Sequence, residues 1–172
     1  MANATTLLPR GVAKVLNSPT LAVQSYFIAY GVMQGYSFAN IKWMCKQFRL
    51  ETANGTSNVF ESFYNVSGMG CVQVRENKQS GCYTAPNGEN IGTYKNVNDS
   101  VCCRYLWDAY WGFDTDKRSS RYPQVVSERY HGSPNYMASV DAVSVPNWQL
   151  SVLLTLATLP LEFILIRKLW NF

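Results

Sequence analysis

Five cysteines are the residues of this chain best suited to covalent chemistry. Cys71 and Cys82 flank a predicted hairpin, Cys102 and Cys103 are adjacent, and Cys45 stands apart. In an oxidising compartment this set would fit two disulfides, or one disulfide with free thiols, and Cys71 with Cys82 would staple the hairpin. Buried free thiols are the alternative. Because no CxxC-like pair occurs, the spacing does not favour a zinc site.

One histidine and one pair of aspartates are the remaining candidates for acid–base or metal chemistry. His131 stands in a turn-rich stretch without a companion motif, so we interpret it as a loop residue. Asp114 and Asp116 begin like a calcium loop but lack the glycine and the closing glutamate at the required offsets. No GxGxxG, P-loop, HExxH or GxSxG motif occurs. The sequence therefore predicts no catalytic, cofactor-binding or metal-binding residue, and we expect the chain not to be an enzyme.

The net charge of +4 is unevenly distributed along the 172 residues. Residues 1–50 contain five basic and no acidic residues, so the remaining 122 carry 10 basic and 11 acidic groups. An acid-free basic start is typical of mitochondrial targeting segments, and no apolar run of the secretory type follows it. We therefore expect residues 1–18 to form an amphipathic N-terminal segment of a mitochondrial protein.

The segment from Trp148 to Trp170 is the most apolar part of the chain. Between residues 150 and 166 its one charged side chain is Glu162. As a helix it would be about 33 Å long, close to the thickness of a bilayer core. The terminal tryptophans, with Arg167 and Lys168, are suited to the membrane interface and to anionic headgroups such as cardiolipin. The segment predicts a transmembrane helix; a buried C-terminal helix is the alternative.

Glu162 would be an intramembrane carboxylate, which is costly and therefore suggests a function. Because it lies only five residues before Arg167, snorkelling or pairing with a neighbouring subunit's cation is favoured over a proton relay.

Residues 19–50 form a second long helical pattern. Ser18 followed by Pro19 is a typical helix start, and no charged residue occurs between Lys14 and Lys42. Gly31 and Gly35 form a small-xxx-small pair that lets helices pack closely in lipid, although Gly35 could equally break the helix. We interpret this segment as a long helix that is a candidate second span.

Residues 51–147 contain short elements without a strong periodic core. We expect a helix near 58–64, a hairpin at 71–86, and a helix that starts at Asp99 or Ser100 and ends at Gly112. Within that helix Arg104 and Asp108 are spaced i, i+4. Residues 114–147 are polar and rich in turn residues, which favours an extended segment that wraps a neighbouring subunit.

Four sequons for N-glycosylation occur, at Asn3, Asn54, Asn65 and Asn98. This number is a mild excess over chance, and it supports an extracellular or endoplasmic-reticulum location for the intervening head.

These patterns predict a mainly α membrane protein with a C-terminal transmembrane helix at 148–172, a helix or second span at 19–50, and an irregular cysteine-containing head at 51–147. We expect a non-catalytic accessory subunit of a large complex of the mitochondrial inner membrane, of the respiratory-chain or ATP synthase type, which braces neighbouring subunits and lipid. The alternative is a two-pass glycoprotein of the plasma membrane or endoplasmic reticulum that serves as an auxiliary channel or receptor subunit. We expect no cofactor and no nucleic-acid partner.

Overall fold

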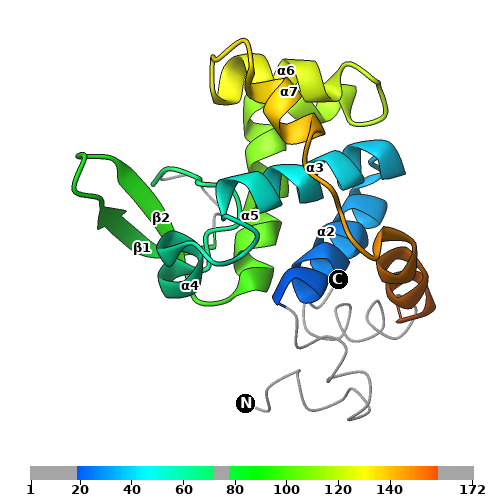
Figure 1. The fold of residues 1–172 in the computed structure, drawn as a ribbon, viewed down its shortest axis with the longest axis horizontal. Coiled ribbons are helices and arrows are strands. Elements are labelled where there is room, and N and C mark those ends of the chain that lie inside the picture. The colour runs from blue at the N-terminus through cyan, green and yellow to red at the C-terminus, as the bar shows by residue number, and fades with distance from the viewer. Residues whose placement is uncertain (1–18, 72–77, 159–172) are drawn as a thin grey trace.

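The computed structural model describes residues 19–71 and 78–158, which form helices and one small sheet (Figure 1). The elements are α2 (Pro19–Gln34), α3 (Phe38–Glu51), α4 (Asn58–Phe63), β1 (Gln79–Thr84), β2 (Asn90–Tyr94), α5 (Val97–Trp111), the 3-10 turn η2 (Phe113–Asp116), α6 (Tyr122–Tyr130) and α7 (Tyr136–Asp141). Residues 148–158 are also helical. The predicted amphipathic segment 1–18 and the residues Glu162, Arg167, Lys168 and Trp170 lie outside the described part.

The predicted continuous helix over 19–50 is wrong, because the chain turns between α2 and α3. Gly35 adopts a left-handed backbone conformation with φ +78°, which glycine tolerates without steric cost. The Ser37 side chain then accepts a hydrogen bond from the amide of Asn40 at 3.2 Å and caps the start of α3. Two helices therefore pack against each other where the sequence pattern predicted one.

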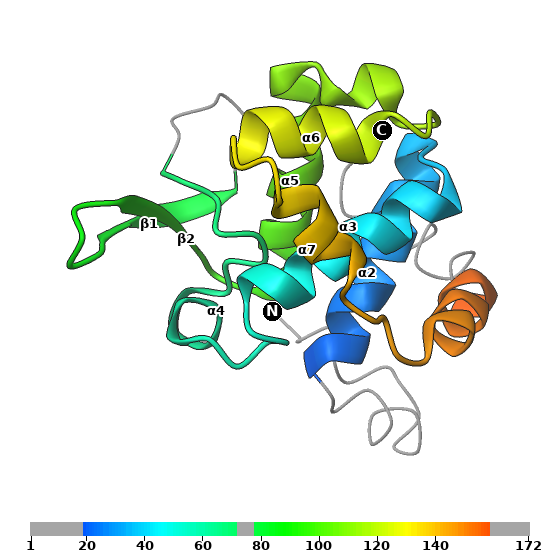
Figure 2. The ribbon, with the colours of Figure 1, turned by 45° about the horizontal axis from the view of Figure 1, so that its top comes forward.

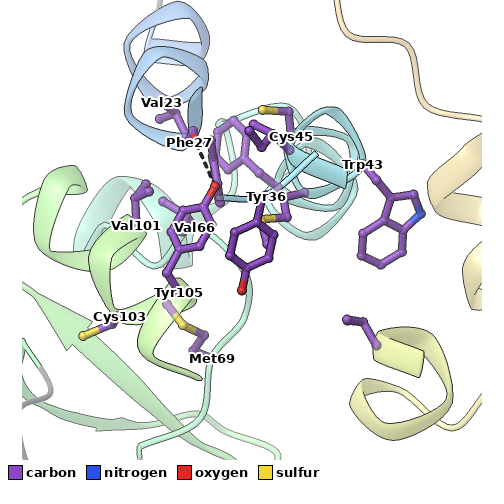
Figure 3. Close-up of a cluster of buried hydrophobic side chains, with 14 of the residues drawn as sticks. Val23, Phe27, Tyr36, Trp43, Cys45, Val66, Met69, Val101, Cys103 and Tyr105 are labelled. Carbon is purple, nitrogen blue, oxygen red and sulfur yellow. Dashed lines mark hydrogen bonds between the residues drawn. The ribbon is translucent and has the colours of Figure 1, made fainter. Parts of the chain in front are cut away.

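A hydrophobic core lies between α2, α3 and α5 (Figure 3). Tyr105 of α5 donates a hydrogen bond to the carbonyl of Phe27 at 2.7 Å, and both residues are buried. Gly31 lies at the contact of the three helices, since a Cβ atom there would stand 2.5 Å from Ile41 and 2.6 Å from the Tyr105 hydroxyl. Residues 51–147, which have no strong periodic core pattern of their own, share this core with residues 19–50, because apolar residues far apart in the sequence meet there.

The hairpin formed by β1 and β2 projects from one side of the helices, next to α4 (Figure 1). Cys82 pairs with Gly92 in its antiparallel register, and the turn spans residues 85–89. The hairpin predicted at 71–86 is therefore displaced along the chain, because its strands are residues 79–84 and 90–94. The turn between them includes Gly88 at φ +85°.

The segment 114–147 folds back onto the protein and does not extend away from it. Its helices α6 and α7 contact α3, and α6 also contacts η2, so that they cover one end of α3 and α5 (Figure 2). Pro123 stands in the first turn of α6, where its missing N–H group costs nothing. Local turn residues had suggested an extended chain, but tertiary contacts fold this segment into short helices.

The predicted membrane-protein fold is also wrong. Across residues 19–71 and 78–158, every helix falls short of the length or the hydropathy that a bilayer crossing requires. In helix 148–158, which contains the first half of the predicted C-terminal span, Ser151 and Thr155 are buried. The Ser151 hydroxyl donates to Gln24 of α2 at 2.9 Å. Ser151 thus faces α2, and Thr155, one turn later, donates to the Ser151 carbonyl, so the mean hydropathy of the helix does not show which side of it is buried.

Candidate functional site

Glu51, the last residue of α3, stands at the start of an irregular stretch of backbone. The three residues Ala53, Asn54 and Gly55 all have positive φ angles, of 47°, 64° and 82°. Such values are unfavourable for residues other than glycine, and local strain of this kind concentrates at functional sites. The Thr52 hydroxyl stabilises the turn by accepting from the amide of Gly55 at 2.9 Å.

The Glu51 carboxyl has one oxygen held by the protein and one that faces an open position. Tyr136 of α7 donates its hydroxyl hydrogen to Oε1 at 2.5 Å. Oε2 lies 3.3 Å from where a Cβ atom of Gly68 would stand, and the Tyr130 hydroxyl lies 3.6 Å from the same point. Gly68 is exposed and has φ +60°. Because it has no side chain, solvent or a ligand can approach this side of the carboxyl group.

The Tyr130 hydroxyl is a second polar group at this point. It is buried and has no hydrogen-bond partner among the residues that the structure describes. A buried hydroxyl without a partner is unusual in a folded protein, and an ordered water is the common partner of such a group. Glu51 and Tyr130 therefore present one free acceptor and one free hydroxyl beside the same glycine.

Burial raises the pKa of the Glu51 carboxyl above the usual range of a glutamate. The hydrogen bond from Tyr136 and the charges of His131 and Arg104 act in the opposite direction without cancelling this effect. A carboxyl group that keeps its proton to a higher pH is suited to act as a general acid.

A buried polar network leads from the centre of the protein to this carboxyl. Arg104 and Asp108 of α5 form an ion pair, and both side chains are at most 1% exposed. Asp108 Oδ2 also accepts from the hydroxyls of Tyr36, at 3.0 Å, and Tyr122, at 2.5 Å. Arg104 Nη2 donates to Gln47 Oε1 at 3.0 Å. The i, i+4 spacing of the ion pair was visible in the sequence, but its burial was not.

Gln47 connects this network with the site, because its Nε2 donates to the Tyr136 hydroxyl at 3.0 Å. The rings beside it are stacked. The ring centroids of His131 and Tyr136 are 4.6 Å apart, with an angle of 8° between the planes, and those of Tyr130 and Tyr136 are 6.0 Å apart. His131, predicted to be a loop residue, follows α6 directly and is exposed. Aromatic groups therefore surround the Glu51 carboxyl on the side of α6 and α7.

Two cysteines of the predicted set are joined in the structure. Cys71 and Cys82 form a disulfide that ties the loop before the hairpin to β1. Cys45, Cys102 and Cys103 are free thiols, and burial raises the pKa of Cys103 to about 11. Burial also raises the pKa values of Cys45 and Cys102, so none of the three thiols has the low pKa of a reactive nucleophile.

The other predicted site residues lie away from Glu51 or are used in packing. Lys42 stands 5.9 Å above the ring of Trp148, which lines an apolar groove on the surface. Gly31 packs in the core and Gly35 ends α2, as described above. Among the described residues, no group of three histidine, cysteine or acidic side chains could hold a metal ion.

The sequons differ in accessibility. Asn65 is buried, and its amide donates to the carbonyls of Met69 and Gly92 at 2.8 and 2.9 Å. A glycan on that nitrogen would replace one of its two hydrogens and so remove at least one of these bonds. Asn54 is exposed, whereas the Asn98 side chain accepts from Tyr30 at 3.1 Å.

Sequence reasoning missed Glu51, Gln47, Tyr130 and Tyr136. The only local signal was an acidic residue three positions before a turn-forming Asn-Gly pair, which is too common to indicate a site. Comparisons of the chain with protein-family models, with curated proteins and with solved structures found no match.

Proposed function

We propose that the protein is a glycoside hydrolase in which Glu51 acts as the general acid. The observation that carries the proposal is the half-buried Glu51 carboxyl, with its raised pKa, one oxygen held by Tyr136 and the other beside the exposed Gly68. A carboxyl group in a partly apolar site that keeps its proton is the usual acid of glycosidases.

The chemistry follows from what such an acid can do. Cleavage of a glycosidic bond needs a proton on the leaving oxygen, because a sugar alkoxide is a poor leaving group. Glu51 would donate that proton as the bond between the anomeric carbon and the oxygen breaks. Water then adds to the anomeric carbon, and the proton that it releases restores the Glu51 acid through solvent.

The surroundings of Glu51 suit a sugar ring. Aromatic rings offer flat apolar faces together with polar hydroxyls, which matches the alternation of C–H and O–H groups on a sugar. Tyr136 is buried beside the carboxyl, so the exposed rings that a sugar can contact are His131, which stacks on Tyr136, and Tyr64, 41% exposed, in the loop that leads to Gly68. The same loop joins the hairpin, since Gly70 forms a bridge with Ile91 of β2. A polysaccharide bound beside Gly68 would therefore contact both the helices and the hairpin.

The sequence-based expectation of a non-catalytic accessory subunit in a mitochondrial membrane complex relied in part on a transmembrane helix, and no helix within residues 19–71 and 78–158 has the length and hydropathy of one. The polar surroundings of Glu51 favour the enzymatic proposal.

The test is release of new reducing ends from a panel of polysaccharides that includes chitin, cellulose, starch and purified bacterial cell wall. We expect the wild-type chain to cleave at least one of them and Glu51→Gln to lose about a thousandfold or more of that activity, because an amide cannot donate the required proton. Glu61→Gln is the matched control, since Glu61 is an exposed glutamate on α4. Cleavage of none of the substrates, or full activity of Glu51→Gln, would refute the proposal.

A further inference from the structure

Arg104 determines which atoms donate and which accept in the hydrogen bonds of the buried network. A guanidinium group carries only hydrogen-bond donors, so the atom that it contacts must be an acceptor. Arg104 Nη2 lies 3.0 Å from the side chain of Gln47, which must therefore turn its oxygen towards Arg104. Because an amide has its oxygen and nitrogen on opposite sides, the Gln47 nitrogen then faces away from Arg104.

That nitrogen faces Tyr136 and determines the role of the tyrosine. Gln47 Nε2 lies 3.0 Å from the Tyr136 hydroxyl oxygen and donates to it. A tyrosine hydroxyl has a single hydrogen, and a donor already occupies the side that faces Gln47. The hydrogen must therefore point to the other neighbour, the Glu51 Oε1 atom 2.5 Å away.

We infer that Gln47 is a positioning residue: held by Arg104, it directs the Tyr136 hydroxyl hydrogen at Glu51 and so keeps the Glu51 proton on the open oxygen, Oε2, beside Gly68. This inference rests on the proposed function. An acid whose inner oxygen already accepts a hydrogen bond carries its own proton on the outer oxygen, where a substrate can take it.

Arg104 is held in place as a donor, so the donor and the acceptor in each hydrogen bond of the network stay the same. Burial opposes the charge of Arg104, but the charges and hydrogen bonds of Asp108 and Tyr122 outweigh that effect and raise its pKa. Asp108 is itself held by two tyrosine hydroxyls. Arg104 therefore stays protonated and stays a donor throughout the pH range in which Glu51 titrates.

The groups that face Glu51 come from each element packed around it. They are Tyr136 from α7, Tyr130 and His131 from the end of α6, and Arg104 from α5. The Gly68 loop adds no charged group of its own. If Gln47 acts on Glu51 through Tyr136, the change in the Glu51 pKa caused by a substitution at Gln47 should be much smaller when the Tyr136 hydroxyl is removed.

The experiment is a double-mutant cycle with Gln47→Glu and Tyr136→Phe, read by NMR titration of the Glu51 side-chain carboxyl in the full chain. A carboxylate at position 47 still accepts from Arg104 but now attracts the Tyr136 hydrogen away from Glu51. We expect Gln47→Glu to raise the pKa of Glu51, and to raise it much less in the Tyr136→Phe background. In the wild-type background the basic limb of any pH–activity profile should move upward by about one pH unit.

Two further variants keep the test decisive. Gln24→Glu introduces the same change at another fully buried glutamine, on α2, and should leave the Glu51 pKa unchanged. If Gln47→Glu does not fold, Gln47→Met removes both hydrogen bonds at similar length and should move the Glu51 pKa towards that of Tyr136→Phe.

Equal shifts from Gln47→Glu in the two backgrounds would overturn the inference, because they would reveal a charge effect that bypasses Tyr136. An unchanged pKa in Gln47→Met would overturn it as well. Both readings are independent of activity, so a chain that cleaves no polysaccharide would refute the proposed function while the titration still decides the role of Gln47.

Discussion

The Tyr136 hydroxyl donates to the carboxyl of Glu51 at 2.5 Å, although 85 residues separate the two in the sequence. The contact joins α7 to the end of α3. The segment 114–147, which the sequence suggested would wrap a neighbour, therefore completes the candidate site within the same chain.

Glu51→Gln should stabilise the protein at neutral pH. The folded-state pKa of Glu51 is raised, so its contribution to stability is fully present below the unfolded-state pKa of about 4.3 and is lost as the pH rises through the folded value. The neutral amide avoids that loss, and we expect a gain of about 1 kcal/mol at pH 7. Thermal unfolding at pH 7 and pH 4 measures it. The gain in stability should be smaller at pH 4, and a gain of equal size at pH 4 and pH 7 would contradict the raised pKa of Glu51.

Gly68→Ala should reduce activity more than it reduces stability. The residue has φ +60°, and a new Cβ would stand 3.3 Å from Glu51 Oε2, where substrate must approach. Gly88→Ala is the matched control, because Gly88 has φ +85° but nothing within 4 Å of its Cβ position. Both should lose about 1 kcal/mol of stability through backbone strain. Only Gly68→Ala should lose activity, and similar activity in the two variants would place substrate elsewhere.

Asp108→Asn should be strongly destabilising. It leaves the buried Arg104 charge without its anionic partner, which typically costs about 3–5 kcal/mol. Asp141→Asn is the comparison, because the Lys46–Asp141 pair is 3.9 Å long and its Asp141 side chain is 51% exposed, so its loss should cost less than about 1 kcal/mol. Urea unfolding curves of the two variants give the difference. Comparable costs would show that the interior pair is better solvated than its burial implies.

Loss of the Cys71–Cys82 disulfide should weaken the fold. The bond closes a loop with a sequence separation of 11, for which about 2–3 kcal/mol is expected from the reduced freedom of the unfolded chain. Paired Cys71→Ser and Cys82→Ser substitutions should therefore lower the free energy of unfolding by that amount. Cys102→Ser, at a free thiol, is the control. Wild-type protein treated with reductant should match the paired variant, and an unchanged stability would argue against the bond.

Local sequence signals determined several features of this protein correctly. Gly112 ends α5 in a left-handed conformation with φ +74°, as expected for a glycine after a helix. Helix α2 begins at Pro19, and Arg104 and Asp108 pair across one helical turn. These features depend on residues within about four positions of each other, so neighbouring side chains and backbone preferences decide them.

Only the tertiary structure decided which surfaces are buried and where the candidate site lies. Hydropathy along 148–158 suggested a membrane span, but Ser151 pairs with Gln24, 127 residues earlier. Glu51 is a candidate acid because Tyr136 and Tyr130 contact its surroundings from helices that lie much later in the sequence. The pKa of a carboxyl group depends on burial and on neighbours in space, and no local pattern records which distant residues will supply them.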